Sequence, residues 1–177
     1  MPGRSLSVFD NDNKRGDSSM KKVVFIALAA LVFTGTFAWA DKATEQEVRQ
    51  AIIDGNAYVR KNLKSQPEGY SKDGAIEFWS SGGFMQKIPA NTRPEEYESF
   101  NINVKHIHVT ILVPGQAAIA HYYSEGSMQP KGGAAISNYR TRVSQVFVKE
   151  GGTWKVRASH WSPMAGGAGT NQTALVE

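Results

Sequence analysis

The sequence predicts one small α+β domain, in which a strongly curved antiparallel sheet packs as a cone against a long N-terminal helix and short helices. Three observations support this fold class. An amphipathic segment with helical spacing begins near residue 44, and four long β-rich segments joined by short turns fill the C-terminal half. Apolar residues make up 41% of the 177-residue chain, which is enough for one core rather than two.

The first 40 residues are expected to precede this domain as an export signal. Two lysines stand before the apolar run 23–33, and Ala38 and Ala40 provide the small-x-small form that signal peptidase accepts. This run is shorter than the ~20 residues that cross a bilayer. Residues 20–40 are therefore predicted to be a signal peptide cleaved after Ala40, with an uncleaved membrane anchor as the alternative. The polar residues 1–19 are predicted to be disordered or to result from a wrongly chosen start codon.

The mature protein is therefore expected to be periplasmic or secreted, and to touch a membrane only transiently through its signal peptide. Its domain is predicted to span residues 41–164, with a flexible tail at 165–177. After residue 40 the chain has 15 Lys and Arg against 13 Asp and Glu, scattered along the sequence, so no nucleic-acid partner is expected. The absence of cysteine excludes disulfides, thiolate metal sites and thiol catalysis.

The long helix is predicted to begin at Thr44, because Thr44 and Glu47 have the spacing of a capping box. Apolar residues then recur at helical spacing, at Val48, Ile52, Val59 and Leu63. This pattern predicts a helix of about 20 residues with one apolar face. Pro67 and Gly69 are expected to end it.

Two short elements are predicted between this helix and the main sheet. Residues 75–79 and 84–88 have the composition of strands, and the glycines in the linking segment 80–83 can adopt turn conformations, so a hairpin is predicted. Thr92 and Glu95 repeat the capping-box spacing, with a proline in the first turn. This spacing predicts a short helix that ends near residue 100.

Four long strands are predicted for the rest of the domain. They span residues 102–113, 116–128, 136–149 and 153–162. Short turns between long strands indicate an antiparallel meander. Because right-handed twist and bulges curl strands of this length, the sheet is expected to enclose a concave face that the amphipathic helix covers.

The end of the chain carries a more specific pattern. A strand with Arg142 ends in an acidic residue and two glycines, and the return strand contains Trp154 and later His160 and Ser162. This pattern and the order of elements resemble the SnoaL-like branch of the nuclear transport factor 2-like superfamily. They are also similar to the calcium/calmodulin-dependent protein kinase association domain and to ketosteroid isomerase-like proteins. The superfamily includes isomerases, cyclases, dehydratases and assembly modules, so the resemblance implies a fold and leaves the function open.

His160 and Arg142 are the central site candidates, and strand alternation is expected to point both into the hollow of the sheet. The kinase association domain has an arginine where this chain has Ser144, and Arg140 or Arg142 on the same strand face could replace it. An arginine there could pair with a carboxylate, and a histidine could transfer a proton near neutral pH. The alternative is that these side chains bond each other, Glu77 or a backbone carbonyl without contacting a ligand.

Other residues complete the predicted site. The candidate catalytic residues are His160 and Glu77, and the carboxyl of Glu77 would have a raised pKa if it were buried. The predicted ligand-binding residues are His121, Tyr123, Arg140, Arg142, His160, Tyr58 and Trp79. Core packing is the simpler alternative for the aromatic members, as is an outward position for Glu77. His106 and His108 have a spacing that zinc sites use, but the more apolar opposite face of their strand turns them outward, so no metal or other cofactor is expected.

Three functions remain open from the sequence. The leading hypothesis is an exported homodimer that binds a small molecule, partly apolar or anionic and of unknown identity, without turnover. The second is an isomerase, cyclase or dehydratase in which His160 or Glu77 moves a proton and Arg142 or Tyr123 stabilises an enolate oxygen. The third is a homo-oligomeric assembly module that associates through its outer sheet face. No phosphate-binding loop or nucleophile elbow is visible, which disfavours phosphoryl transfer and serine hydrolysis.

Overall fold

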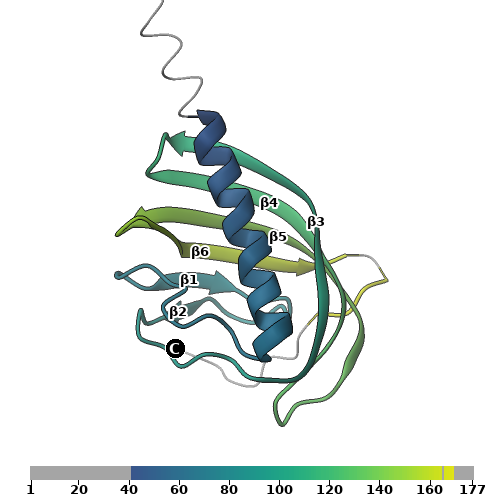
Figure 1. Cartoon of the computed structure of the whole chain (residues 1–177). Helices are drawn as coiled ribbons and strands as arrows, with labels where there is room; N and C mark the ends of the chain where they lie inside the picture. The colour runs from purple at the N-terminus through teal and green to yellow at the C-terminus, as the bar shows by residue number, and fades with distance from the viewer. Residues whose placement is uncertain (1–40, 165, 170–177) are drawn as a thin grey trace, which may run out of the picture. The chain divides into compact units, whose positions relative to one another are not determined.

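The computed structural model describes residues 41–164 and 166–169, so the predicted signal peptide and the extension before it lie outside the described residues. Within these ranges, one long helix packs on a six-stranded, mostly antiparallel sheet that does not close (Figure 1). This arrangement confirms the predicted α+β cone. In the described part of the chain, no helix is long and apolar enough to cross a membrane.

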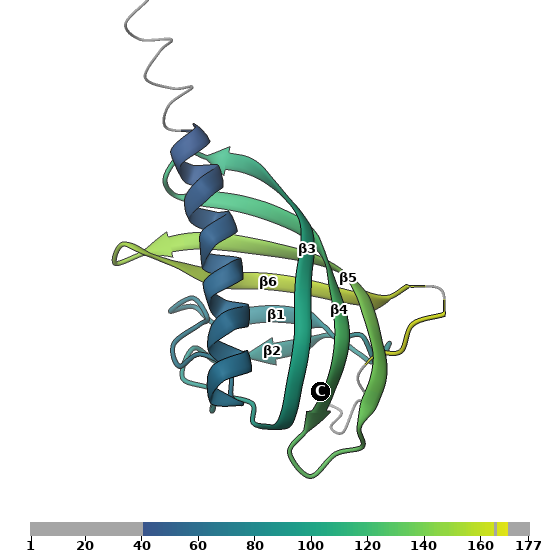
Figure 2. The same cartoon turned by 45° about the vertical axis from the view of Figure 1, so that its right-hand side comes forward.

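Six strands form the sheet in the order β2-β1-β6-β5-β4-β3. They are β1 (Ala75–Phe78), β2 (Gln86–Ile88), β3 (Tyr97–Val113), β4 (Ala117–Pro130), β5 (Ile136–Glu150) and β6 (Thr153–Pro163). All neighbours pair antiparallel except β1 and β6, which run parallel (Figures 1 and 2). The predicted hairpin and the predicted four-stranded meander are both present, and the hairpin docks beside the last strand of the meander.

The helix occupies residues 41–62 of the described chain and begins earlier than the sequence predicts. Residues 41–43 are already helical, so the predicted start at Thr44 is wrong. Thr44 is only 2% exposed, and its Oγ1 accepts a hydrogen bond of 2.8 Å from the backbone amide of Gly115, in the turn between β3 and β4. The hydroxyl that the capping-box spacing assigns to the helix start instead joins the helix to the sheet.

The short helix predicted for residues 92–100 is absent, because this segment pairs with the chain that follows the long helix. The Ser65 amide donates to the Glu95 carbonyl at 2.8 Å, and the Glu95 amide donates to Ser65 Oγ at the same distance. The Tyr97 amide donates to the Leu63 carbonyl, also at 2.8 Å. These bonds hold the backbone extended up to the start of β3, which overrides the local capping-box pattern.

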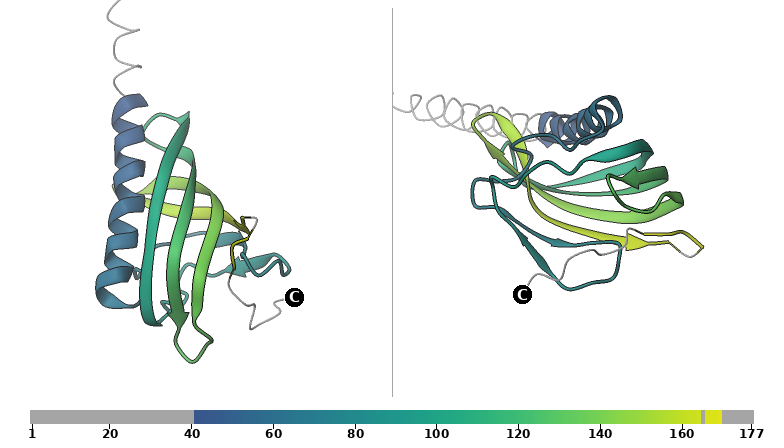
Figure 3. Two further views of the ribbon diagram at one scale, coloured as in Figure 1. Left: turned by 90° about the vertical axis from the view of Figure 1, so that its right-hand side faces the viewer. Right: turned by 90° about the horizontal axis from the view of Figure 1, so that it is seen from below.

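The helix covers the concave face of the curved sheet (Figure 3). Val48 and Ile52 of the helix share a buried cluster with residues of the long strands, namely Val109, Ala118, Ala120, Tyr122, Val143 and Phe147. Ala118 and Ala120 have no exposed surface, and their small side chains let the helix lie close to β4. Alternate residues of the long strands therefore form an inner face toward the helix and an outer face away from it.

A bulge in β6 changes which of its residues face the helix. Phe147 of β5 pairs with Val156, whereas the preceding Val146 pairs with Ala158, so Arg157 is an extra residue on β6. An extra residue reverses the alternation of side chains along the strand. Before Arg157, the even-numbered residues of β6 consequently face the helix. After Arg157, the odd-numbered residues face it.

Part of the predicted flexible tail lies along β5. The Ala168 amide donates to the Asn138 carbonyl at 2.8 Å, and the Ala168 carbonyl accepts from the Arg140 amide at 3.2 Å. Residue 165 and residues 170–177 lie outside the described residues. Residues 166–169 thus continue the pairing of β5 beyond the end of β6.

Candidate ligand cavity

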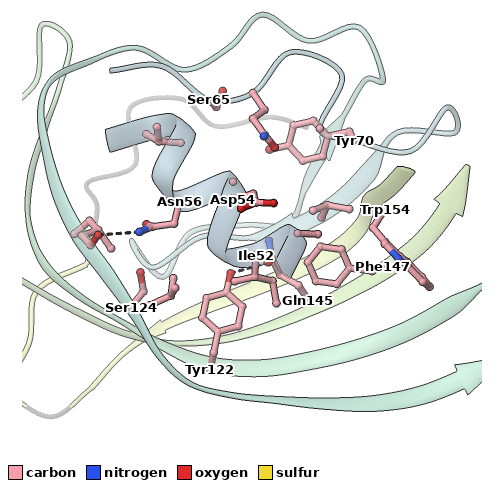
Figure 4. Close-up of a pocket in the computed structure, with 18 of the residues that line it drawn as sticks. Ile52, Asp54, Asn56, Ser65, Tyr70, Tyr122, Ser124, Gln145, Phe147 and Trp154 are labelled. Carbon is pink, nitrogen blue, oxygen red and sulfur yellow. Dashed lines mark hydrogen bonds between the residues drawn. The ribbon is translucent and has the colours of Figure 1, made fainter. Parts of the chain in front are cut away.

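A cavity of about 770 Å³ lies between the helix and the inner face of the sheet (Figure 4). Ile52 of the helix packs in one cluster with Tyr122 of β4 and Phe147 of β5, and all three line the cavity. A second group of cavity-lining residues comes from another buried cluster and its neighbours, namely Ile102, Met128, Tyr139, Tyr97 and Phe100. Small-molecule sites typically enclose about 300–1,000 Å³ with a mostly apolar lining, so both the size and the lining suit a small ligand.

Glu77 in β1 lines this cavity and is only 5% exposed. Its Oε1 accepts a hydrogen bond of 2.5 Å from Ser159 Oγ, to which Trp161 Nε1 donates in turn at 3.2 Å. Its Oε2 accepts from Trp79 Nε1 at 2.9 Å and from the Tyr70 hydroxyl at 3.4 Å. The parallel pairing of β1 with β6 sets Glu77 beside Ser159, so donors from segments far apart in the sequence converge on one carboxyl.

Within the described part of the chain, the carboxyl of Glu77 has hydrogen-bond donors around it but no positive partner. Burial raises its pKa above the ordinary value of 4.5, and the hydrogen bonds from Ser159 and Trp79 offset only part of this effect. Burial also raises the pKa of Tyr70, whose phenol therefore stays protonated near neutral pH. Among the described residues, no Lys, Arg or His lies within 4.0 Å of the Glu77 carboxylate oxygens. A buried carboxyl of this kind is sensitive to the charge of anything that enters the cavity.

A second polar group lines the cavity between the apolar residues of β4 and β5. The Tyr122 hydroxyl donates to Gln145 Oε1 at 2.7 Å, and both side chains are buried (Figure 4). This bond fixes the orientation of the amide and leaves its NH₂ group as a donor for a ligand. Ser124, on the same face of β4, adds a buried hydroxyl to the lining.

An ion pair joins the helix to the sheet at the cavity wall. Glu47 Oε2 accepts from Lys149 Nζ at 2.6 Å and from Trp154 Nε1 at 2.9 Å, and all three residues line the cavity. These hydrogen bonds lower the pKa of Glu47. Lys149 Nζ also lies 5.6 Å from the centre of the Trp154 ring, within cation–π distance. The contact ties the first turns of the helix to the β5–β6 hairpin.

Of the sequence-predicted site residues, only Glu77 and Trp79 line the cavity. The sequence predicts His160 in the hollow of the sheet, but it is exposed on the outer face, where its ring lies 5.7 Å from that of Phe78. The Arg157 bulge causes this error, because it reverses the alternation that extends from Trp154 along β6.

The predicted inward position is also wrong for the β4 and β5 candidates. His121, Tyr123 and Arg142 are exposed on the outer face, together with the partly exposed Arg140. His121 Nδ1 lies 2.9 Å from Ser144 Oγ on that face, within hydrogen-bond distance. Both faces of these strands carry apolar residues, and the alanines of β4 form the core side because the helix needs small residues there.

The remaining candidates lie apart from the cavity. Tyr58 is on the helix, half-buried, and is not among the cavity-lining residues. His106 and His108 are exposed, as their strand pattern predicts. His106 adopts a φ of 53° at a bulge, where the pairing of β3 with β4 shifts. No sequence pattern predicts this bulge.

Several cavity residues are not predicted from the sequence. Tyr70 follows the helix in an irregular segment, and Gln145 and Ser124 are polar residues within apolar strands. Gln145 lies between the apolar Val143 and Phe147 on the inner face of β5. A polar residue at such a position is the feature from which a cavity residue could be predicted. That feature is recognisable only once the inner face of the strand has been assigned.

No protein-family model and no curated protein matches the chain. Among solved structures, it is similar to a candidate aromatic ring hydroxylase from Novosphingobium aromaticivorans, with a TM-score of 0.52 and 16% identity over 72% of this chain and 94% of that one. It is also similar to a candidate calcium/calmodulin-dependent kinase II association domain from Exiguobacterium sibiricum, with a TM-score of 0.49 and 12% identity over 67% of this chain and 92% of that one.

A third similar structure is a nuclear transport factor 2-like protein of unknown function from Pseudomonas putida, with a TM-score of 0.48 and 20% identity over 76% of this chain and 98% of that one. At these identities the likeness concerns the fold alone. The helix on the concave face of an open, curved sheet is the arrangement that the end of the sequence implied. The chain therefore has the cone-shaped α+β fold that the sequence predicts.

Proposed function

We propose that the protein binds a small, largely apolar molecule in the cavity between the helix and the sheet, without converting it. The observation that carries this proposal is a volume of about 770 Å³ whose lining surface is contributed more by aromatic and aliphatic side chains than by polar ones. The NH₂ group of Gln145 offers a donor to the ligand, and Glu77 offers an acceptor. These polar groups would orient a ligand, whereas the apolar part of the lining would supply most of the binding free energy.

The residues around the cavity favour a different class of ligand from the one that the sequence suggested. The sequence predicts that Arg140 and Arg142 receive an anionic group, but both lie on the outer face of β5. The charged side chains that line the cavity are mainly carboxylates. We therefore propose an uncharged or positively charged ligand rather than an anionic one.

Binding of a neutral fluorescent probe tests this proposal. The fluorescence of N-phenyl-1-naphthylamine should rise on binding to the purified protein, because the probe leaves water for an apolar site. Ala51→Phe should weaken the binding at least tenfold, since Ala51 lines the cavity. Ala57→Phe is the matched control, because Ala57 is an exposed residue of the same helix outside the cavity lining, and it should bind like the wild type. Equal binding by both variants would show that the probe sits elsewhere.

The proposed function also includes export of the protein from the cytoplasm. We propose that the mature protein begins at Asp41, after cleavage behind Ala40, and works in the periplasm or outside the cell. N-terminal sequencing of protein recovered from the periplasm or medium should find Asp41 as the first residue. A full-length chain retained in the cytoplasm would contradict this part of the proposal.

Proton transfer by Glu77 is a second candidate function, and the raised pKa of this buried carboxyl favours it. If Glu77 acts as an acid or base, the protein should accelerate exchange of the α-protons of a bound cyclic ketone such as 1-tetralone with D₂O, as followed by NMR. Glu77→Gln should abolish the acceleration while probe binding persists. The binding proposal expects exchange at the buffer rate in both proteins.

A further inference from the structure

The charges that line the cavity are strongly unequal. Among the described lining residues, the carboxylates of Glu47, Asp54, Glu77 and Glu95 face one cation, Lys149. Lys149 already pairs with Glu47 at 2.6 Å. An anion entering the cavity would therefore meet no unpaired cation among these residues, whereas a cation would meet several carboxylates.

Among these lining carboxylates, Glu77 has the charge that is least compensated by water or by a positive group. It is buried, and its partners Ser159, Trp79 and Tyr70 are neutral hydrogen-bond donors. Neutral donors replace part of the lost hydration of a carboxylate, but they do not cancel its charge. A positive group placed beside Glu77 would cancel it within a low-dielectric site, where the attraction is much stronger than in water.

Aromatic rings surround the same carboxyl. Trp79 and Tyr70 donate hydrogen bonds directly to the Glu77 carboxyl, and Trp161 donates one to Ser159, which itself donates to Glu77. Tyr122 then packs edge-on to Trp161, with ring centroids 6.2 Å apart. The faces of indole and phenol rings attract cations, and a ring-lined site with a carboxylate is a common solution for binding ammonium groups.

We propose that the ligand of this cavity is an organic amine with an apolar body, whose ammonium group pairs with Glu77 among these aromatic rings. This inference rests on the binding function proposed above and adds the charge of the ligand to it. The apolar body lies along Ile52, Tyr122 and Phe147, which form the hydrophobic part of the lining. A neutral hydroxyl ligand would only add another donor to Glu77 and leave its charge in place.

Three probes of nearly equal shape separate ligand charge from ligand size. They are 1-naphthylmethylamine, 1-naphthylmethanol and 1-naphthoate, which are positive, neutral and negative at pH 7. Their dissociation constants would be measured by displacement of N-phenyl-1-naphthylamine and by calorimetry. The wild type should bind the amine at least tenfold more tightly than the alcohol, and the naphthoate more weakly than both.

Two variants test whether Glu77 causes the preference. Glu77→Gln should reduce the ratio of amine to alcohol affinity to about one or below while the alcohol still binds. Glu98→Gln is the control, because Glu98 is an exposed carboxylate outside the cavity lining, and it should leave the ratio within about twofold of the wild type. A tenfold ratio that survives Glu77→Gln would overturn the assignment to Glu77.

The wild-type ratio decides the inference even if Glu77→Gln does not fold. Equal affinity for the amine and the alcohol would overturn the proposed ligand class and leave the binding of small apolar molecules standing. Failure of N-phenyl-1-naphthylamine and of all three naphthyl probes to bind would overturn the inference together with the proposed function.

Discussion

At the scale of single residues, Glu77 is the group on which both stability and binding depend. Its carboxyl is 5% exposed and receives hydrogen bonds from three side chains, but it has no positive partner among the described residues. A buried charge without a counter-charge destabilises the folded state, although donors reduce the cost. The folded protein is therefore expected to carry a penalty that a bound cation would remove.

The stability of the protein should depend on pH through this carboxyl. Burial places the pKa of Glu77 in the folded state above its ordinary value of 4.5. A group with a raised folded-state pKa contributes stability below its unfolded pKa, and this contribution is lost as the pH rises through the folded-state value. Relative to Glu77→Gln, the wild type should therefore lose free energy of unfolding between pH 4 and pH 8, as measured by urea denaturation.

Neighbouring groups do not obscure this comparison. Tyr70 and Tyr122 have pKa values raised by burial and stay neutral throughout the range, and Glu95 is present in both proteins. Glu98→Gln, at an exposed carboxylate, serves as the control and should leave the pH dependence of the wild type unchanged. A difference between wild type and Glu77→Gln that stayed constant from pH 4 to pH 8 would contradict the prediction.

Of the residues that the sequence suggests for a site, Glu77 and Trp79 do line the cavity, and both lie in a short hairpin whose alternation is regular. The sequence could not place His160, since the Arg157 bulge reverses the face of β6 and no residue type marks that bulge. The predicted position of Arg142 is wrong for another reason, because valines stand on both faces of β5 and only the packing of the helix decides between them. Site prediction failed where the face of a strand depends on tertiary contacts.

At the scale of elements, the pairing of β3 with β4 depends on one glycine. Gly126 pairs with Ile102 and has a φ of 149°, and a Cβ added to it would lie 2.1 Å from the backbone oxygen of Asn101. Backbone atoms of a paired strand cannot move aside as a flexible side chain can. This position therefore requires a residue without a side chain.

Gly126→Ala should destabilise the protein by about 3 kcal/mol or more, through backbone strain and overpacking together. Gly115→Ala is the matched control, because Gly115 also has a positive φ, 67°, but a Cβ added there would have no other atom within 4 Å. That control should cost about 1 kcal/mol from strain alone. Urea denaturation measures both values, and equal losses would show that the contact with β3 is not the cause.

The elements themselves were largely predictable, because hydrophobic periodicity and turn residues are local signals. The four long strands and the hairpin appear where the pattern places them, within a few residues. The helix predicted at Thr92 is wrong because its capping pattern is outweighed by pairing with Ser65, which is distant in the sequence. Local patterns decided most elements, and long-range backbone pairing decided this exception.

At the scale of the whole molecule, the outer face of the sheet offers a surface for self-association. Ile76 and Phe78 of β1 and Tyr123 of β4 are 38%, 43% and 37% exposed on this face. Exposed apolar residues on a sheet surface are a common feature of protein interfaces. We propose a homodimer that associates through this face, which leaves the cavity on the opposite side of the sheet accessible.

Light scattering should report twice the mass of the mature chain, and Phe78→Lys should raise the dimer dissociation constant at least tenfold. Phe84→Lys is the matched control, because Phe84 is 73% exposed in the loop between β1 and β2, and it should leave the dimer intact. Binding of the fluorescent probe should be unchanged in both variants, since neither residue lines the cavity. A wild type that remains monomeric at high concentration would exclude the dimer.

The parallel pairing of β1 with β6 also dictates when the binding site can form. Glu77 and Ser159 are separated by 82 residues, so the polar end of the cavity requires the closure of a very long loop. Contacts of this separation form slowly, whereas the β3–β4–β5 meander can assemble from neighbouring hairpins. During synthesis or after translocation, the meander is therefore expected to fold first. The protein is expected to bind its ligand only after β6 has paired with β1 of the hairpin.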